Sequence, residues 1–186
     1  WGDWGENRDM RLIYAAWHYM ALDAAARMAD LLGKTQDAYL YRQKMTQVKR
    51  GYNACWTGKA YRHPTFTGDT DDRVQALAII SGIADTDKYP AISKLLRTQK
   101  HASPYMEKYV MESLFQMGDG EYAMERAHER YHHMVMDSLH TTLYEGWLAG
   151  ANGFGGGTTN HAWSGGPLTV IAQYLMGVSV REPGWK

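Results

Sequence analysis

The sequence has 186 residues, 45% of them hydrophobic, which is enough to build a sizeable core. Its 20 basic residues equal its 20 acidic residues, so the formal net charge is zero and gives no electrostatic case for a nucleic acid or an anionic membrane as partner. Cys55 is the single cysteine, which excludes an internal disulfide, and the longest apolar run, residues 12–22, is too short to span a bilayer.

Two long helices are predicted first. Residues 11–32 are apolar around most of the helix circumference, which is typical of a helix buried on several sides, and Gly33 is suited to end it. Residues 36–56 carry one apolar stripe at alternating spacings of three and four, which indicates packing against a single partner. We therefore expect an antiparallel hairpin with one inner and one outer helix.

Shorter helices are predicted beyond the Gly- and Thr-rich loop at residues 57–71. Their apolar spacing and their glycine or aspartate breaks place them at residues 72–84, 88–97, 104–117, 120–135 and 167–177. Strand character is confined to residues 141–144, Thr-Thr-Leu-Tyr. A repeated helix-turn-helix pattern of this kind favours an all-α toroid or solenoid in a single domain over residues 1–186.

Several helix starts carry capping signals. Ser103 followed by Pro104 is a cap with proline in the first turn. Residues 71–73, Asp-Asp-Arg, are interpreted as a helix start with its own ion pair. We expect capping and turn roles for the acidic residues near the N-terminus, which are Asp3, Glu6 and Asp9.

The segment from Thr141 to Gly166 holds the densest set of candidate functional groups. It contains Glu145 and Trp147, then a glycine-rich loop, then His161 in the sequence Asn-His-Ala-Trp. A carboxylate, an imidazole and indoles in one irregular segment predict a polar pocket with apolar walls. The plainer interpretation is a solvated loop carboxylate with tryptophans in the core. The excess of Tyr and Trp over Phe suits a sugar site and suits a protein interface equally.

Residues 128–132, His-Glu-Arg-Tyr-His, match the HExxH pattern of zinc peptidases. Two histidines four residues apart on a helix can share a metal, with Glu129 as base. However, His128 and His132 flank the apolar stripe of this helix on its polar side, and a third ligand is not evident. We interpret the motif as a solvated helix face and keep the peptidase as an alternative.

Several segments, taken together and in order, resemble a known family. They are GDWGEN, TGDTDDRVQALAIISG, ASPYMEKYVMESLFQMG, TTLYEGW, NHAWSGGPLTVIAQYLMGV and PGWK. As a set they resemble the catalytic domain of bacterial α-L-rhamnosidases, glycoside hydrolase family 78. The resemblance implies a barrel of twelve helices, the (α/α)6 fold, of which this chain matches the second half. We thus expect a partial (α/α)6 barrel of about seven helices in antiparallel hairpins, and the start at Trp1 suggests a fragment of a longer chain.

The resemblance also implies a reaction, the hydrolysis of terminal α-L-rhamnosides with inversion. The family's general base falls on Glu145, within the segment TTLYEGW. The family's general acid lies in an upstream motif that this chain lacks, so the chain alone is expected to be inactive. A non-catalytic carbohydrate-binding relative is the alternative within the same fold. The resemblance implies neither a cofactor nor a metal.

Substrate contacts are implied at five further positions. His161 matches a histidine that contacts the sugar, and Trp4 and Trp147 are expected to form apolar walls, with core packing as the plainer interpretation of both. Tyr105 and Glu107 are expected near the pocket, where ASPYMEK replaces a glycine-rich stretch of many relatives.

The expected partners are a rhamnose-containing glycan and either the remaining half of the barrel or a second copy of the chain. This second partner is expected because helices one and seven would otherwise leave an apolar flank exposed. The sequence leaves the compartment open, and relatives of this kind are periplasmic or cytoplasmic.

Overall fold

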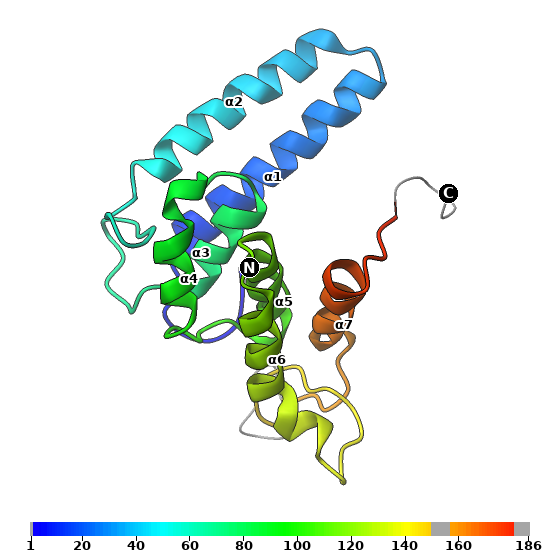
Figure 1. The fold of residues 1–186 in the computed structure, drawn as a ribbon. Coiled ribbons are helices and arrows are strands. Elements are labelled where there is room, and N and C mark those ends of the chain that lie inside the picture. The colour runs from blue at the N-terminus through cyan, green and yellow to red at the C-terminus, as the bar shows by residue number, and fades with distance from the viewer. Residues whose placement is uncertain (1, 150–156, 181–186) are drawn as a thin grey trace. The chain divides into compact units, whose positions relative to one another are not determined.

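The computed structural model describes residues 2–149 and 157–180 (Figure 1). Two compact units account for the chain, one made of Trp1–Gly2 and Glu6–His101 and the other of Asp3–Gly5 and Ala102–Lys186. The regular structure of the described residues is helical, apart from an isolated antiparallel bridge between Trp56 and Tyr61. The predicted all-α class is therefore confirmed.

The first unit is built on the predicted hairpin. Helix α1 (Met10–Leu31) packs along α2 (Thr35–Asn53), and the two run antiparallel in Figure 1. Helix α1 buries six residues and α2 only two, which confirms an inner and an outer helix. The unit is completed by α3 (Asp72–Ile80), by the short 3-10 helix η1 (Thr86–Lys88) and by α4 (Tyr89–Leu96). Its core centres on α3, where eight of nine residues are buried.

A buried polar cluster ties the start of α3 to the N-terminal segment. The Asp71 carboxylate caps α3 by accepting from the Arg73 amide, accepts from the Asp9 amide at 2.9 Å, and pairs with Arg73 Nε at 2.7 Å. The Arg73 guanidinium also donates to the carbonyls of Glu6 and Asn7. The predicted helix start with its own ion pair is thus confirmed, and the pair also organises the chain that precedes α1.

This cluster predicts a pH dependence. Burial raises the pKa of Asp71 to about 6, against the lowering effect of Arg73. Below about pH 4 the Asp71 carboxyl is protonated in both the folded and the unfolded protein. Between about pH 4 and 6 it ionises more readily in the unfolded chain, so its contribution to the stability of the folded protein is lost as the pH rises. We expect the free energy of unfolding, measured relative to Asp71→Asn by urea titration, to fall by about 2 kcal/mol over this range. A pH-independent difference between the two proteins would contradict the account.

The second unit contains a second hairpin and the segment that carries the candidate site. Helix α5 (Pro104–Gln116) packs against α6 (Gly120–Val135) and α7 (Gly166–Val170). Ser103 caps α5 as predicted, and the Asp3 carboxylate accepts from both the amide and the hydroxyl of Ser103. The 3-10 helix η4 (Ala162–Gly165) leads directly into α7.

Two local predictions in this unit are wrong. The described residues 141–144 form no strand; Leu143 and Glu145 each make one backbone hydrogen bond, of 2.9 Å, to the segment 158–161, which is too few for a ladder. Strand propensity alone does not supply a partner strand. The seventh helix is also not continuous, because α7 passes into a π-helical turn, η5 (Ile171–Leu175), before Gly177 takes a φ of 72°.

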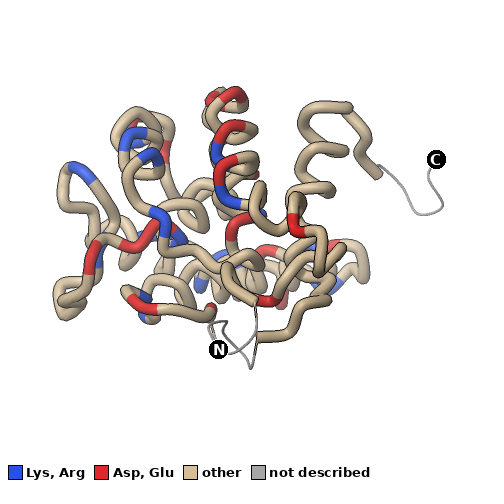
Figure 2. Tube along the Cα trace, turned by 90° about the horizontal axis from the view of Figure 1, so that it is seen from below, with Lys and Arg blue, Asp and Glu red and all other residues tan. Residues whose placement is uncertain are grey.

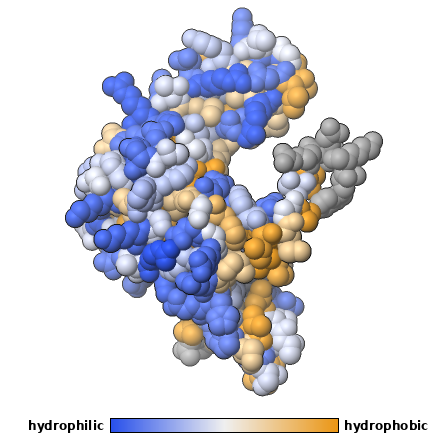
Figure 3. Space-filling view, viewed as in Figure 1, coloured by the Kyte–Doolittle hydropathy of each residue, from blue (hydrophilic) through white to orange (hydrophobic). Residues whose placement is uncertain are grey.

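The described surface mixes charge and leaves apolar residues exposed. Acidic and basic positions are interspersed along the trace, whereas α7 carries no charge (Figure 2). Figure 3 shows apolar surface over α7 and at the tip of the α1–α2 hairpin, where Leu168 is 70% and Leu31 is 87% exposed. Each helix of the described chain is too short or too polar to cross a bilayer.

Candidate functional site

Glu145 lies in the loop between α6 and α7, and only 7% of its surface is exposed. Its amide donates to the Thr158 carbonyl at 2.9 Å, and the His161 amide donates to Leu143 at the same distance. These two bonds bring the two ends of the loop together. As a result, Glu145 Oε2 lies 3.7 Å from His161 Nδ1, and the His161 side chain remains 33% exposed. Two of the six residues predicted for the site therefore form one acid–imidazole pair, in which the carboxylate is nearly buried and the imidazole is partly exposed.

A row of aromatic rings extends from this pair. The His161 ring lies 4.2 Å from Trp163, and Trp163 lies 5.3 Å from Tyr105 in the first turn of α5, measured between ring centroids. Trp163 Nε1 donates to the Glu145 carbonyl at 3.2 Å, which fixes the indole to the same loop. Trp163 is one of the indoles of the predicted pocket, but it was not among the residues predicted to contact the sugar. Its neighbours make it the central ring of the candidate site.

Tyr105 lies in the predicted region and is half-buried. Burial raises the pKa of its phenol to about 12, with a further contribution from the Tyr109 hydroxyl. Like an ordinary phenol, Tyr105 is protonated at neutral pH, and its hydroxyl oxygen can accept hydrogen bonds while it is engaged with Tyr109.

Trp147 is also half-buried, but its indole is engaged inside the unit. Its Nε1 donates to the Ala102 carbonyl at 2.8 Å, and the Arg130 guanidinium lies 4.0 Å from its ring centroid. The Tyr131 ring meets it edge-on at 5.0 Å. Its remaining surface borders a shallow hollow of about 300 Å³ shared with Arg130, His133 and Leu148. These contacts attach the Glu145 loop to the start of α5.

Of the two remaining predicted site residues, Glu107 is buried in the interior of the unit and Trp4 is half-buried. Glu107 is fully buried, and its carboxylate pairs with Arg126 and, at 3.4 Å, with Arg130. Glu107 was predicted as a sugar contact near the pocket, and the structure places it in the interior of the unit. Trp4 is half-buried and follows Asp3, whose carboxylate binds Ser103, so Trp4 lies near the N-terminal end of α5.

The HExxH histidines do not form part of this site. His128 and His132 are exposed on α6 with ring centroids 5.0 Å apart, and they border an apolar hollow of about 440 Å³. In residues 2–149 and 157–180, no three groups of the metal-binding types come together. The described residues therefore supply no third ligand for the zinc alternative. Of the predicted core stripe of this helix, Ala127, Tyr131 and Met134 are buried and Met124 is half-buried.

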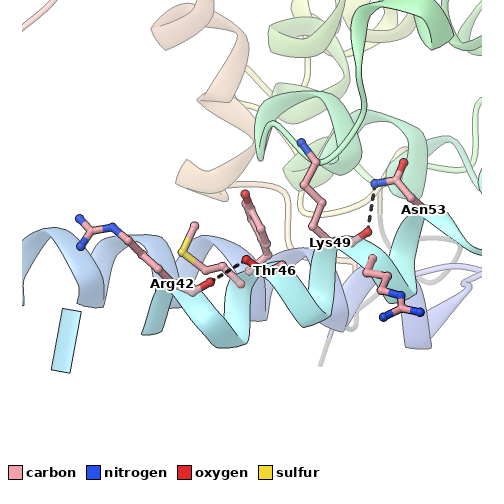
Figure 4. Close-up of a pocket in the computed structure, with 7 residues that line it drawn as sticks. Arg42, Thr46, Lys49 and Asn53 are labelled. Atoms are coloured by element: carbon pink, nitrogen blue, oxygen red, sulfur yellow. Dashed lines mark hydrogen bonds between the residues drawn. The ribbon is translucent and has the colours of Figure 1, made fainter. Parts of the chain in front are cut away.

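A larger hollow, of about 510 Å³, lies in the first unit along α1 and α2 (Figure 4). Several of its polar side chains are already engaged within the unit. Thr46 donates to the Arg42 carbonyl and Asn53 to the Lys49 carbonyl, both at 3.0 Å, while Arg42 is paired with Asp30. This hollow is larger than those of about 300 and 440 Å³ described above, but it lacks the combination of a carboxylate, an imidazole and neighbouring aromatic rings that the Glu145 region provides.

Comparison with known proteins adds two findings. A family model described as the bacterial alpha-L-rhamnosidase 6 hairpin glycosidase domain matches residues 1–175. Among solved structures, the crystal structure of a GH78 family rhamnosidase of Bacillus sp. GL1 matches with a TM-score of 0.75 and 20% sequence identity. The match covers 98% of this chain but 21% of that one, and at this identity it supports the fold alone. No curated protein matches the sequence.

Proposed function

Because the chain belongs to the family of bacterial α-L-rhamnosidase six-hairpin glycosidase domains, we propose that it is the second half of an (α/α)6 catalytic barrel in a longer enzyme that hydrolyses terminal α-L-rhamnosides. The observation that carries this proposal is the pairing of the nearly buried Glu145 with the half-exposed His161 beside Trp163. The remaining half of the barrel, or a second copy, would cover the exposed apolar residues of α7.

In this proposal Glu145 is the general base of an inverting reaction. It accepts a proton from a water molecule as that water attacks the anomeric carbon, and a general acid from the rest of the enzyme protonates the leaving oxygen. The two carboxyl groups would lie about 6.5–9.5 Å apart, which leaves room for the water. Limited exposure of Glu145 suits this role, because few water molecules can reach the carboxylate and one can be held in a fixed orientation.

The sugar would lie against the aromatic row. The apolar C–H face and the methyl group of a 6-deoxy sugar pack well on indole and phenol rings, so Trp163 and Tyr105 are proposed as walls, with Trp4 at the same end of α5. His161 and the Tyr105 hydroxyl would bind sugar hydroxyls. We assign Trp147 and Glu107 instead to holding the loop, since their polar groups are engaged inside the unit.

Incubation of the longer enzyme with 4-nitrophenyl α-L-rhamnoside tests this function. We expect release of nitrophenol, with β-L-rhamnose as the first product in the proton NMR spectrum, and no release from the β-D-glucoside used as control. Binding of the rhamnoside by calorimetry without release would favour the non-catalytic carbohydrate-binding alternative. Initial formation of α-L-rhamnose would contradict the base role of Glu145, since it indicates a covalent intermediate.

A further inference from the structure

Trp147 connects the Glu145 loop to the body of its unit, and three contacts hold it. Its indole N–H donates to the Ala102 carbonyl at 2.8 Å, and its own carbonyl oxygen lies 2.6 Å from His133 Nε2. The Arg130 guanidinium lies 4.0 Å from the ring centroid. Because Trp147 follows Glu145 by only two residues, a shift of this indole would move the carboxylate with it.

Arg130 contacts this attachment point through both the Trp147 ring and the Ala102 carbonyl. Its Nη2 donates to the Ala102 carbonyl at 2.7 Å, so Arg130 and Trp147 share one acceptor at the start of α5. A guanidinium is planar and carries several donors in a fixed fork, so it can lie against an indole and bond the same carbonyl at once. A lysine ammonium would supply the charge but not this geometry.

The position of Arg130 is fixed in turn by a buried ion-pair group. Its Nε lies 3.4 Å from Glu107 Oε2, and the same carboxylate oxygen is 3.1 Å from Arg126 Nη2. The Arg130 side chain is 8% exposed, while the side chains of Glu107 and Arg126 are fully buried. A buried charge in this arrangement has little freedom to move, because leaving its partners would strand an unpaired charge in the interior.

We propose that Arg130 is a positioning residue for Glu145, acting through Trp147 and touching neither the sugar nor the attacking water. This inference rests on the proposed function and adds to it a residue from the HExxH segment, in which Arg130 and Tyr131 contact the indole. A misplacement of a reacting group by about 1 Å costs as much as 10²-fold in rate. The role therefore predicts that a change at Arg130 lowers kcat clearly while the enzyme stays folded with little change in its melting temperature.

The test compares Arg130→Lys with Arg126→Lys in the longer enzyme. Both variants keep a positive charge beside Glu107, but only the first removes the guanidinium that lies against Trp147. For Arg130→Lys we expect kcat to fall by about tenfold or more, with KM within about twofold and the melting temperature close to that of the unchanged enzyme. For Arg126→Lys, which leaves the Arg130 guanidinium against the indole but weakens the buried group that holds it, we expect a lower melting temperature and a smaller fall in kcat than for Arg130→Lys.

A double-mutant cycle with Trp147→Phe shows whether the effect passes through the indole. The phenyl ring cannot donate to Ala102, so Arg130→Lys should cost less in this background than in the unchanged enzyme. If Arg130→Lys lowers kcat by the same factor in the Trp147→Phe background as in the unchanged enzyme, or if kcat is normal in Arg130→Lys, the positioning role is overturned. Either result leaves Glu145 as the base. The proposed function itself fails separately, if the unchanged enzyme does not release rhamnose or if Glu145→Gln keeps full activity.

Discussion

Replacing Glu145 with Gln in the longer enzyme is expected to lower kcat by about 10²- to 10⁴-fold, the usual contribution of a general base. The amide keeps the size of the side chain and its place beside His161, but it cannot accept a proton from water. We expect KM for an aryl α-L-rhamnoside to change by less than about threefold, because in the proposed site the sugar is held mainly by the aromatic walls and His161. Steady-state kinetics with the aryl rhamnoside measures both constants.

Glu129→Gln is the matched control for this experiment. Glu129 is exposed on α6 in the HExxH segment and would be the base of a zinc peptidase. We expect its replacement to leave rhamnoside hydrolysis unchanged. Near-normal turnover in Glu145→Gln would remove Glu145 from the mechanism, whatever the behaviour of Glu129→Gln.

The largest effect on stability is expected from Glu107→Gln. Glu107 and Arg126 are fully buried, so a neutral amide leaves the Arg126 charge in the interior without its counter-charge. Breaking a buried pair by changing one partner costs about 3–5 kcal/mol, because the remaining charge stays desolvated. Denaturant unfolding of the longer enzyme, followed by circular dichroism, is expected to show a loss of this size.

Glu112→Gln provides the comparison within the same helix. Glu112 pairs with Lys108 one turn away at 3.0 Å, but both side chains are partly exposed. A pair of this kind contributes about 0.3–0.5 kcal/mol. Equal losses from the two substitutions would contradict a special role for the buried pair.

Much of the fold could be predicted from the sequence. The periodic apolar pattern located α1 within one residue of its observed bounds, and the Ser103–Pro104 pair identified the start of α5. These predictions succeeded because helix periodicity and capping depend on neighbouring residues. The predicted strand at residues 141–144 failed because a strand needs a partner that local propensity does not provide.

Only part of the candidate site could be predicted from the sequence. Glu145 and His161 were singled out by their residue types in one irregular segment, and a family resemblance supplied their roles. Their approach to one another could not be predicted, because it depends on a loop closed by two backbone hydrogen bonds. The buried role of Glu107 was missed because its partner Arg126 lies on the next helix. The sequence did indicate that Arg126 is buried, because Arg126 falls between Ala123 and Ala127 on the buried face of α6. A charge on a buried face requires an opposite charge nearby.

The location of the sugar tests the central claim most directly. We expect a crystal structure of the longer enzyme carrying Glu145→Gln, with an intact α-L-rhamnoside bound, to show the sugar against Trp163. Its anomeric carbon should face Gln at position 145 across a single water molecule, with a ring hydroxyl bound to His161. A rhamnoside bound elsewhere, with position 145 and Trp163 untouched, would contradict the account.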